Sequence, residues 1–161
     1  MTMTTTDEIR SILDTLERAP DLIVPMVWEI PEERRKTRPA PGKWSAHEHA
    51  CHLADVHDLF FQRLDLMLAS DGAVIEPYLP SSDDEAGALL DQDLETDLQR
   101  FEEDRKRLVA RLRALSPDDW IRAATHPEYS EYSVFIMFRH VALHDHLHGY
   151  RIEEILLEAG A

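Results

Sequence analysis

The sequence is poor in cysteine and glycine, and it contains no apolar run of membrane-spanning length. The one cysteine, Cys51, excludes an intramolecular disulfide, and its apolar surroundings favour a buried, inert thiol. The apolar run at 22–28 is far shorter than the roughly 20 residues that cross a bilayer. The first ten residues lack the basic and apolar regions of a signal peptide. We therefore expect a cytoplasmic protein that is not in the membrane.

Basic residues are also scarce, with 17 lysines and arginines against 32 aspartates and glutamates and a net charge of -15. Affinity for phosphate backbones comes mostly from lysine and arginine. The charge balance therefore predicts no nucleic-acid partner and no anionic membrane surface as a partner. With 161 residues, 43% of them hydrophobic, the chain has the size and composition of a single globular domain over 1–161.

Apolar residues recur at helical spacing along most of the chain, and no stretch shows the strict alternation of a strand. Four long amphipathic segments joined by loops are typical of a four-helix bundle. The sequence therefore predicts an all-α protein without a sheet.

The first helix is predicted to begin at a capping box formed by Thr5 and Glu8. It should stall at 19–20, where Pro20 interrupts it, because proline lacks a backbone N–H. The apolar segment 22–28 is expected to continue it, with a kink near Pro25. The proline-rich and charged residues 31–42 then predict a loop.

The second helix should begin at Ser45, with Glu48 completing a second capping box, and end at 71–72. Its inward face carries Leu53, Val56, Phe60, Leu64 and Met67. Residues 73–90 are acidic and contain two prolines, which predicts a long loop.

The third helix has the most regular pattern, with apolar residues at 94, 98, 101, 108, 112 and 115. Arg105 interrupts this repeat. Ser116 and Pro117 predict the start of a short extra turn. The last helix is expected from about Ser133 to Glu158.

Eight of the nine histidines lie in the second and fourth predicted helices. His144 and His148 are four residues apart within the apolar stripe of the last helix, so both imidazoles can reach one ion. His52 lies on the inward face of the second helix and is the third candidate ligand, whereas His146 should face solvent. Three neutral imidazoles suit a late divalent metal, but buried histidines that are merely hydrogen-bonded are an equally open interpretation of the spacing alone.

Two segments resemble the DinB-like superfamily, which includes damage-inducible DinB and the bacillithiol- and mycothiol-dependent enzymes. The first, residues 41–55 (PGKWSAHEHACHLAD), is similar to the start of that family's second helix, and the second, residues 142–152 (ALHDHLHGYRI), to its second histidine motif. The resemblance implies an up-down-down-up four-helix bundle, often a homodimer. It also implies a divalent metal, with zinc or nickel favoured over iron or manganese, bound by His52, His144 and His148. Arg151 departs from the usual glutamine of the motif.

Several functions stay open at this point. The resemblance favours a metal-dependent thiol S-transferase that uses a small-molecule thiol and an electrophile. A metal-dependent hydrolase and a non-enzymatic stress-related metal- or ligand-binding protein are the alternatives. No catalytic residue is assigned, although His57, His140 and Glu48 are candidates for acid–base or supporting roles. Trp44 and Trp120 are interpreted as packing anchors rather than substrate platforms.

Overall fold

The computed structural model describes residues 6–78 and 87–159, and long helices dominate it. The elements are α1 (Thr6–Glu29), α2 (Glu32–Arg35), α3 (Ala46–Ala69), β1 (Ala73–Val74), the 3-10 helix η1 (Ala88–Asp91), α5 (Leu94–Arg113), α6 (Pro117–Trp120), β2 (Ala124–Thr125) and α7 (Val134–Ala159). The predicted loop at 31–42 therefore contains one helical turn, α2. Thr5, the predicted first cap, lies outside the described residues.

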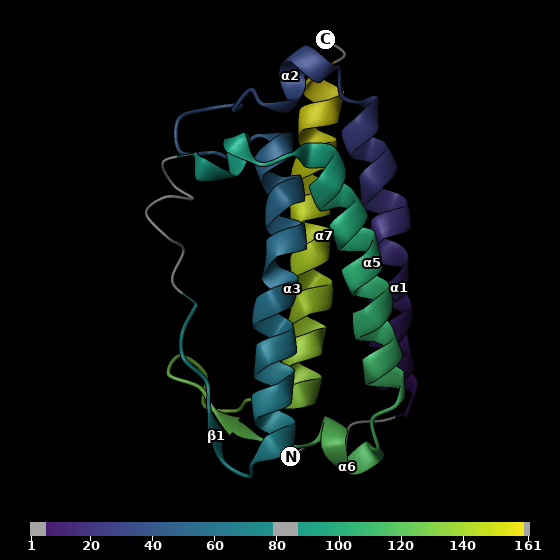
Figure 1. Ribbon diagram of the computed structural model, residues 1–161, viewed down its shortest axis with the longest axis vertical. Helices are drawn as coiled ribbons and strands as arrows, with labels where there is room; N and C mark the ends of the chain where they lie inside the picture. The colour runs from purple at the N-terminus through teal and green to yellow at the C-terminus, as the bar shows by residue number, and fades with distance from the viewer. Residues whose placement is uncertain (1–5, 79–86, 160–161) are drawn as a thin grey trace.

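The four long helices form a bundle with the predicted up-down-down-up order (Figure 1). α1 packs against α7 and α5, and α3 packs against the same two helices. Because α3 and α5 run in the same direction, the end of α3 and the start of α5 lie at opposite ends of the bundle. Long connections of this kind distinguish such bundles from simple up-down-up-down ones. None of the described helices is both long and apolar enough to cross a membrane.

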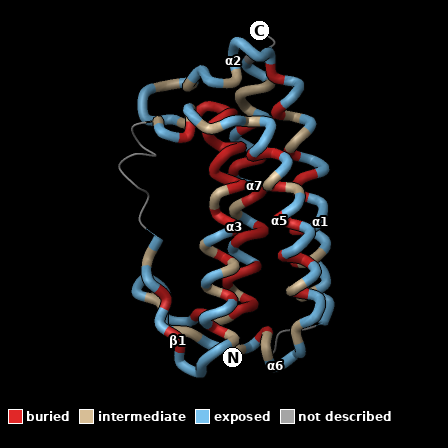
Figure 2. Tube along the Cα trace, viewed as in Figure 1, coloured by how far each residue is buried: buried red, intermediate tan, exposed pale blue. Residues whose placement is uncertain are grey.

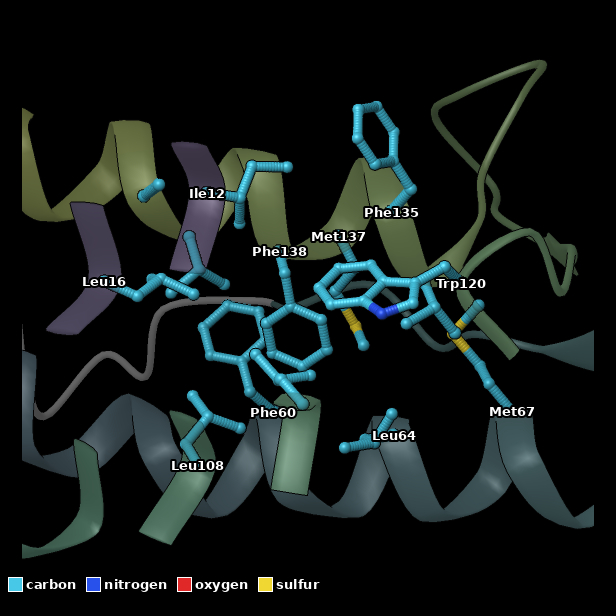
Figure 3. Packing of buried hydrophobic residues seen from close by; sticks show 14 of the residues in the cluster. Ile12, Leu16, Phe60, Leu64, Met67, Leu108, Trp120, Phe135, Met137 and Phe138 are labelled. Atoms are coloured by element: carbon cyan, nitrogen blue, oxygen red, sulfur yellow. The ribbon is translucent and has the colours of Figure 1, made fainter. Parts of the chain in front are cut away.

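Buried residues line the bundle axis along its whole length (Figure 2). One apolar cluster fills the end near α6 and includes Leu16, Phe60, Leu64, Trp120 and Phe138 (Figure 3). A second cluster fills the opposite end, with residues such as Ile23, Val27, Leu53, Phe101 and Ile152. The predicted role of Trp120 as a packing anchor is thus confirmed. Polar side chains occupy the bundle interior between the two clusters.

Local caps start two helices at the predicted positions. The Ser45 hydroxyl accepts the Glu48 backbone N–H at 3.2 Å, and the Glu48 carboxylate accepts the Ser45 N–H at 2.8 Å. Ser116 and Asp119 form the same reciprocal pair at the start of α6. These caps satisfy backbone N–H groups that have no partner within the helix. Gly149 gives α7 its close approach to α1, because an added Cβ would lie 3.1 Å from Ile23 Cγ1.

The predicted stall at Pro20 is wrong, because α1 continues from Thr6–Glu29 through both of its prolines. Pro20 lacks the N–H that would bond the carbonyl of Leu16 in a regular helix. Arg105 replaces that donor, since its Nη1 lies 2.9 Å from Leu16 O. A side chain from α5 thus compensates for the proline in α1.

The prediction of no sheet is also wrong. β1 and β2 form a two-stranded parallel pair in which Ala73 is opposite Ala124 and Val74 opposite Thr125. Strands of two residues are too short to show an alternating pattern, and their partners are distant in sequence. This pairing ties the connection before α7 to the end of α3 and positions residues 126–132 beside the bundle.

Candidate metal centre

Three histidines from two helices converge in the bundle interior. His52 on α3 and His144 on α7 have their Nε2 atoms 3.1 Å apart, and His148 Nε2 lies 3.0 Å from His144 Nε2. One ligand atom from each of the three residues lies within 4.8 Å of the others. We call His52, His144 and His148 the imidazole cluster. The structure therefore brings together the three histidines selected from helical spacing.

The geometry of the imidazole cluster fits a bound ion. Zn–N bonds of about 2.0–2.1 Å in a tetrahedral site place ligand nitrogens about 3.3 Å apart. The two Nε2–Nε2 separations, 3.1 and 3.0 Å, are close to that value. Neutral imidazoles supply lone pairs to zinc, nickel, copper or iron. The donor set thus suits a late divalent metal.

Burial keeps these imidazoles neutral. Burial lowers the pKa of His52 to about 3, with the neighbouring His144 and His49 adding to the shift. Burial also lowers the pKa of His148 to about 2, helped by His144, His52 and His49. The pKa of His144 is lowered mainly by burial as well. Protons therefore compete weakly for the lone pairs at neutral pH.

His49, which the sequence analysis did not select, contacts the imidazole cluster directly. Its Nδ1 lies 2.8 Å from the Nδ1 of His148. Only one of these two nitrogens can carry the shared proton. If His148 directs its Nε2 lone pair toward the cluster, its Nδ1–H donates to His49, whose own proton is then on Nε2. Its position three residues before His52 on α3 was the available signal.

Trp44 packs over the same group of rings. Its ring centroid lies 5.0 Å from that of His52 and 6.0 Å from that of His148, nearly parallel to the latter at 21°. Arg38 pairs with the buried Glu48 carboxylate. These contacts agree with the interpretation of Trp44 as a packing anchor and of Glu48 as a capping residue.

A cavity of about 190 Å³ adjoins two members of the imidazole cluster. His52 and His144 form part of its wall, and the remaining wall comes from α3, the start of α7 and residues 126–132. The other lining residues are Val56, Leu59, Phe60, Arg63, Tyr78, His126, Glu128, Tyr129, Tyr132 and His140. We call this space the histidine cavity. It gives the imidazole cluster an accessible side.

The remaining predicted histidines fall in different environments. His140 is exposed but lines the histidine cavity. His57 is buried away from the cluster, where its Nδ1 donates to Ala54 O at 3.2 Å and its Nε2 accepts from Arg105. His146 is exposed, as predicted. Arg151 pairs with Glu154 and lines a separate cavity on the His49 side, rather than the histidine cavity.

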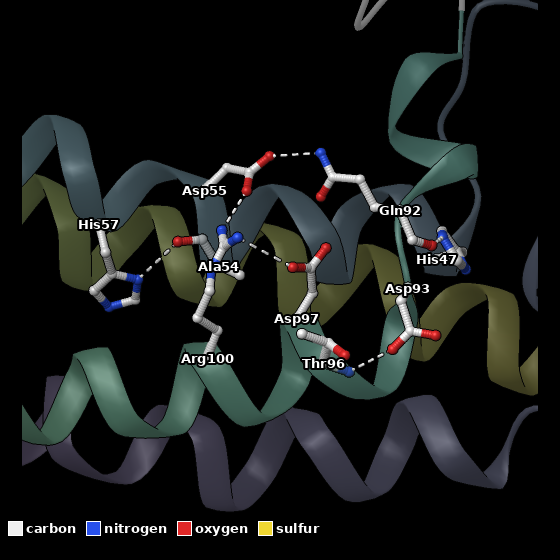
Figure 4. A network of polar contacts seen from close by, with 9 residues as sticks. All are labelled: His47, Ala54, Asp55, His57, Gln92, Asp93, Thr96, Asp97 and Arg100. Atoms are coloured by element: carbon white, nitrogen blue, oxygen red, sulfur yellow. Dashed lines mark hydrogen bonds and ion pairs between the residues drawn. The ribbon is translucent and has the colours of Figure 1, made fainter.

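A second polar network lies between α3 and α5 (Figure 4). Asp55 accepts from Gln92 Nε2 at 3.0 Å and pairs with Arg100, which also lies 3.3 Å from Asp97. Cys51 is buried beside this network, and burial followed by Asp97 raises the pKa of its thiol. The predicted inert thiol is consistent with this environment.

The helix order and the three converging imidazoles make this protein an up-down-down-up helical bundle with an internal candidate metal centre. Residues 15–152 match the DinB superfamily. A protein of Oceanobacillus iheyensis, provisionally named a metal-dependent hydrolase, is 32% identical over 128 residues, covering 78% of this chain and 73% of the relative. The chain therefore belongs to the DinB superfamily.

Two solved structures share the fold. YfiT from Bacillus subtilis, described as a probable metal-dependent hydrolase with an unusual four-helix bundle topology, superposes with a TM-score of 0.84 at 22% identity, covering 99% of this chain and 92% of YfiT. The colibactin self-resistance protein ClbS, solved in complex with a dsDNA, gives a TM-score of 0.66 at 16% identity over 91% of this chain and 94% of ClbS. At these identities the likeness establishes the fold alone.

The acidic composition predicted that nucleic acid is not a partner, and the ClbS structure corrects this prediction. ClbS has the same fold and is bound to a dsDNA, so nucleic acid is not foreign to such bundles. A net charge of -15 describes the long-range field of the whole chain, whereas binding depends on the local surface. The homodimer implied by the family resemblance is likewise not shown by these comparisons.

Proposed function

We propose that this chain is a metal-dependent hydrolase whose divalent transition metal, zinc or nickel in the first place, is bound by His52, His144 and His148. The observation that carries the proposal is the convergence of three imidazoles, those of the buried His52 and His148 and of the half-buried His144, beside the histidine cavity. Three protein ligands leave a coordination position open, which is typical of catalytic rather than structural sites. The descriptions of the Oceanobacillus relative and of YfiT support the reaction class.

When bound, such an ion lowers the pKa of a coordinated water and polarises a carbonyl group. The chain's own residues supply the remaining chemistry. His126 accepts the backbone N–H of Glu128 at its Nδ1, at 3.1 Å, so its proton is on Nε2 and can be donated to a substrate oxygen. His140 lines the same cavity one turn before His144 and is our candidate for accepting a proton from the attacking water.

The second candidate is the thiol S-transfer implied by the family resemblance. The same open position would hold a small-molecule thiol as the thiolate. Cys51 cannot replace that thiol, because it is buried and its pKa is raised. The two reactions therefore share the imidazole cluster and differ in whether water or an external thiol attacks.

Metal content and turnover test the proposal together. Purified protein should hold about one zinc or nickel ion per chain, and hydrolysis of 4-nitrophenyl acetate should require that ion and be lost in His52→Ala. Protein without stoichiometric metal, or equal hydrolysis by His52→Ala, would overturn the proposal. Metal-dependent loss of free thiol with an epoxide, without hydrolysis, would favour S-transfer. A bound metal with neither reaction would favour the non-enzymatic alternative.

A further inference from the structure

Arg63 places a positive charge in the wall of the histidine cavity. Its Nη2 donates to the backbone oxygen of Glu76 at 2.8 Å. Among residues 6–78 and 87–159, no carboxylate forms an ion pair with it. The guanidinium also interacts with the Tyr132 side chain. Because a guanidinium has five N–H donors, these two contacts leave capacity for another acceptor.

The charge of the cavity wall differs from that of the chain as a whole. Among the lining residues that the structure describes, Arg63 and Glu128 are the side chains with a full charge, and Glu128 is exposed. A metal at the imidazole cluster would add positive charge to this wall, although the protein as a whole has a net charge of -15. The planar fork of a guanidinium matches a carboxylate. A phosphate dianion ordinarily draws several cationic or N–H donors, whereas here one guanidinium is present.

Apolar and aromatic groups lie between the two ends of the cavity. His52 and Arg63 are eleven residues apart on α3, close to three full turns, so they lie on the same face of that helix, and both line the cavity. Val56, Leu59 and Phe60 lie between them on that helix and line the cavity. Opposite, the rings of Tyr129 and Tyr132 are parallel within 8°, with centroids 6.2 Å apart. A cavity of about 190 Å³ exceeds the roughly 150 Å³ that admits benzene.

We infer that the histidine cavity takes an ester or amide in which a flat or apolar spacer separates the scissile carbonyl from a carboxylate, and that Arg63 binds this carboxylate. The inference rests on the proposed function, because the imidazole cluster supplies the reacting end. Hydrolysis breaks the acyl C–O or C–N bond. The hydroxyl of the attacking water is added to the acyl carbon, and the remaining proton of that water goes to the leaving oxygen or nitrogen. Arg63 undergoes no bond change and sets specificity.

Two esters that differ only in charge test this specificity. 4-Acetoxybenzoate carries a carboxylate, and 4-acetoxybenzamide is its neutral counterpart. The native protein should have a kcat/KM about 10- to 100-fold higher for the benzoate, the effect of a charge-assisted hydrogen bond. Arg63→Met should remove this preference and Arg63→Lys should retain part of it. Arg111→Met, which removes a surface arginine paired with Asp65, is the matched control and should leave it unchanged.

Binding to metal-free protein separates this inference from the proposed function. Calorimetry should give tighter binding of 4-hydroxybenzoate than of 4-hydroxybenzamide, and Arg63→Met should abolish the difference, whether or not either ester is hydrolysed. Equal affinities for the two ligands, or a preference unchanged in Arg63→Met, would overturn the role of Arg63. Tighter binding of phenyl phosphate than of 4-hydroxybenzoate would overturn the assignment of a carboxylate. Circular dichroism spectra of Arg63→Met and Arg63→Lys that match the native spectrum show that both variants fold. A lost carboxylate preference in Arg63→Met then reflects the missing charge.

Discussion

Two groups of polar side chains inside this bundle include consecutive residues of α7 but differ in how their members are paired. His144 belongs to the imidazole cluster, whereas Asp145 pairs with Arg105 of α5. In the second group, Arg105 Nη2 lies 3.0 Å from Asp145 Oδ1, and Arg105 Nε donates to His57 Nε2 at 3.2 Å. With its bond to Leu16 O, Arg105 connects all four long helices. We call Arg105, Asp145 and His57 the arginine network.

The arginine network is closed, since opposite charges are paired and each described bond joins a donor to an acceptor. The imidazole cluster is open, because three similar nitrogens converge beside a cavity. Buried polar groups normally find partners. The contrast indicates that one group stabilises the bundle, whereas the other is arranged to bind something that the chain does not itself supply.

The largest expected effect is the loss of the ion pair in the arginine network. Asp145→Asn should lower the free energy of unfolding by about 3–5 kcal/mol, because it leaves the buried Arg105 charge unpaired. Urea unfolding of metal-free protein measures this. A loss below about 1 kcal/mol for Asp145→Asn would contradict the stabilising role of the pair.

Acid should weaken the arginine network through His57. Burial, followed by the charge of Arg105, lowers the pKa of His57 to about 4 from its ordinary 6.5. The unfolded chain therefore binds this proton first, so the stability contributed by neutral His57 is present above pH 6.5 and lost as pH falls toward 4. Its share of the slope is about 1.36 kcal/mol per pH unit.

Urea unfolding of the metal-free protein between pH 7 and pH 4 checks this pH dependence. His57→Gln, which keeps an acceptor for Arg105, should reduce the slope. His146→Gln, on the exposed side of α7, should not change it. Equal slopes for native protein and His57→Gln would show that His57 does not contribute.

Substitutions in the imidazole cluster should change the affinity for the metal. His148→Ala removes one of three proposed ligands and should weaken metal binding by more than about 100-fold. Mutation of a residue that only hydrogen-bonds to a metal ligand already lowers the affinity by about 10- to 100-fold. His146→Ala deletes an exposed imidazole two residues away and should leave affinity unchanged. Elemental analysis and competition with a chelator measure both. Equal loss in both variants, or loss in neither, would return the three histidines to the role of ordinary core residues.

A smaller effect is expected at His49, which we predict to orient His148. His49→Phe keeps a ring but removes the Nδ1 acceptor, so metal affinity should fall by about 10- to 100-fold. His49→Asn offers an oxygen near the same position and should recover part of the loss. The buried His47, which bonds Gln92 O instead, supplies the control His47→Phe. The absorption spectrum of the cobalt-loaded protein should shift in His49→Phe and not in the control.

Features that depend on neighbours within one helix could be predicted from the amino-acid sequence. Ser45 and Glu48 marked the start of α3 because a capping box is a local interaction. His144 and His148 were selected because four residues bring side chains to one helical face, and His146 was set apart by the same rule. The fold class followed from apolar periodicity, and the resemblance added the order of the helices.

Features that join segments far apart in the chain depend on how the helices pack and could not be predicted from local patterns. Arg105 was a gap in an apolar repeat until α1 and α7 placed Leu16 O and Asp145 beside it. Pro20 was expected to stall the first helix, but Arg105 of α5, 89 residues from Leu16, supplies the donor that the proline lacks. The contact between His49 and His148 spans 99 residues, and the wall of the histidine cavity comes from α3, Tyr78, residues 126–132 and α7. Periodicity reports which face of a helix is buried, whereas the partner on that face is set by how the helices pack.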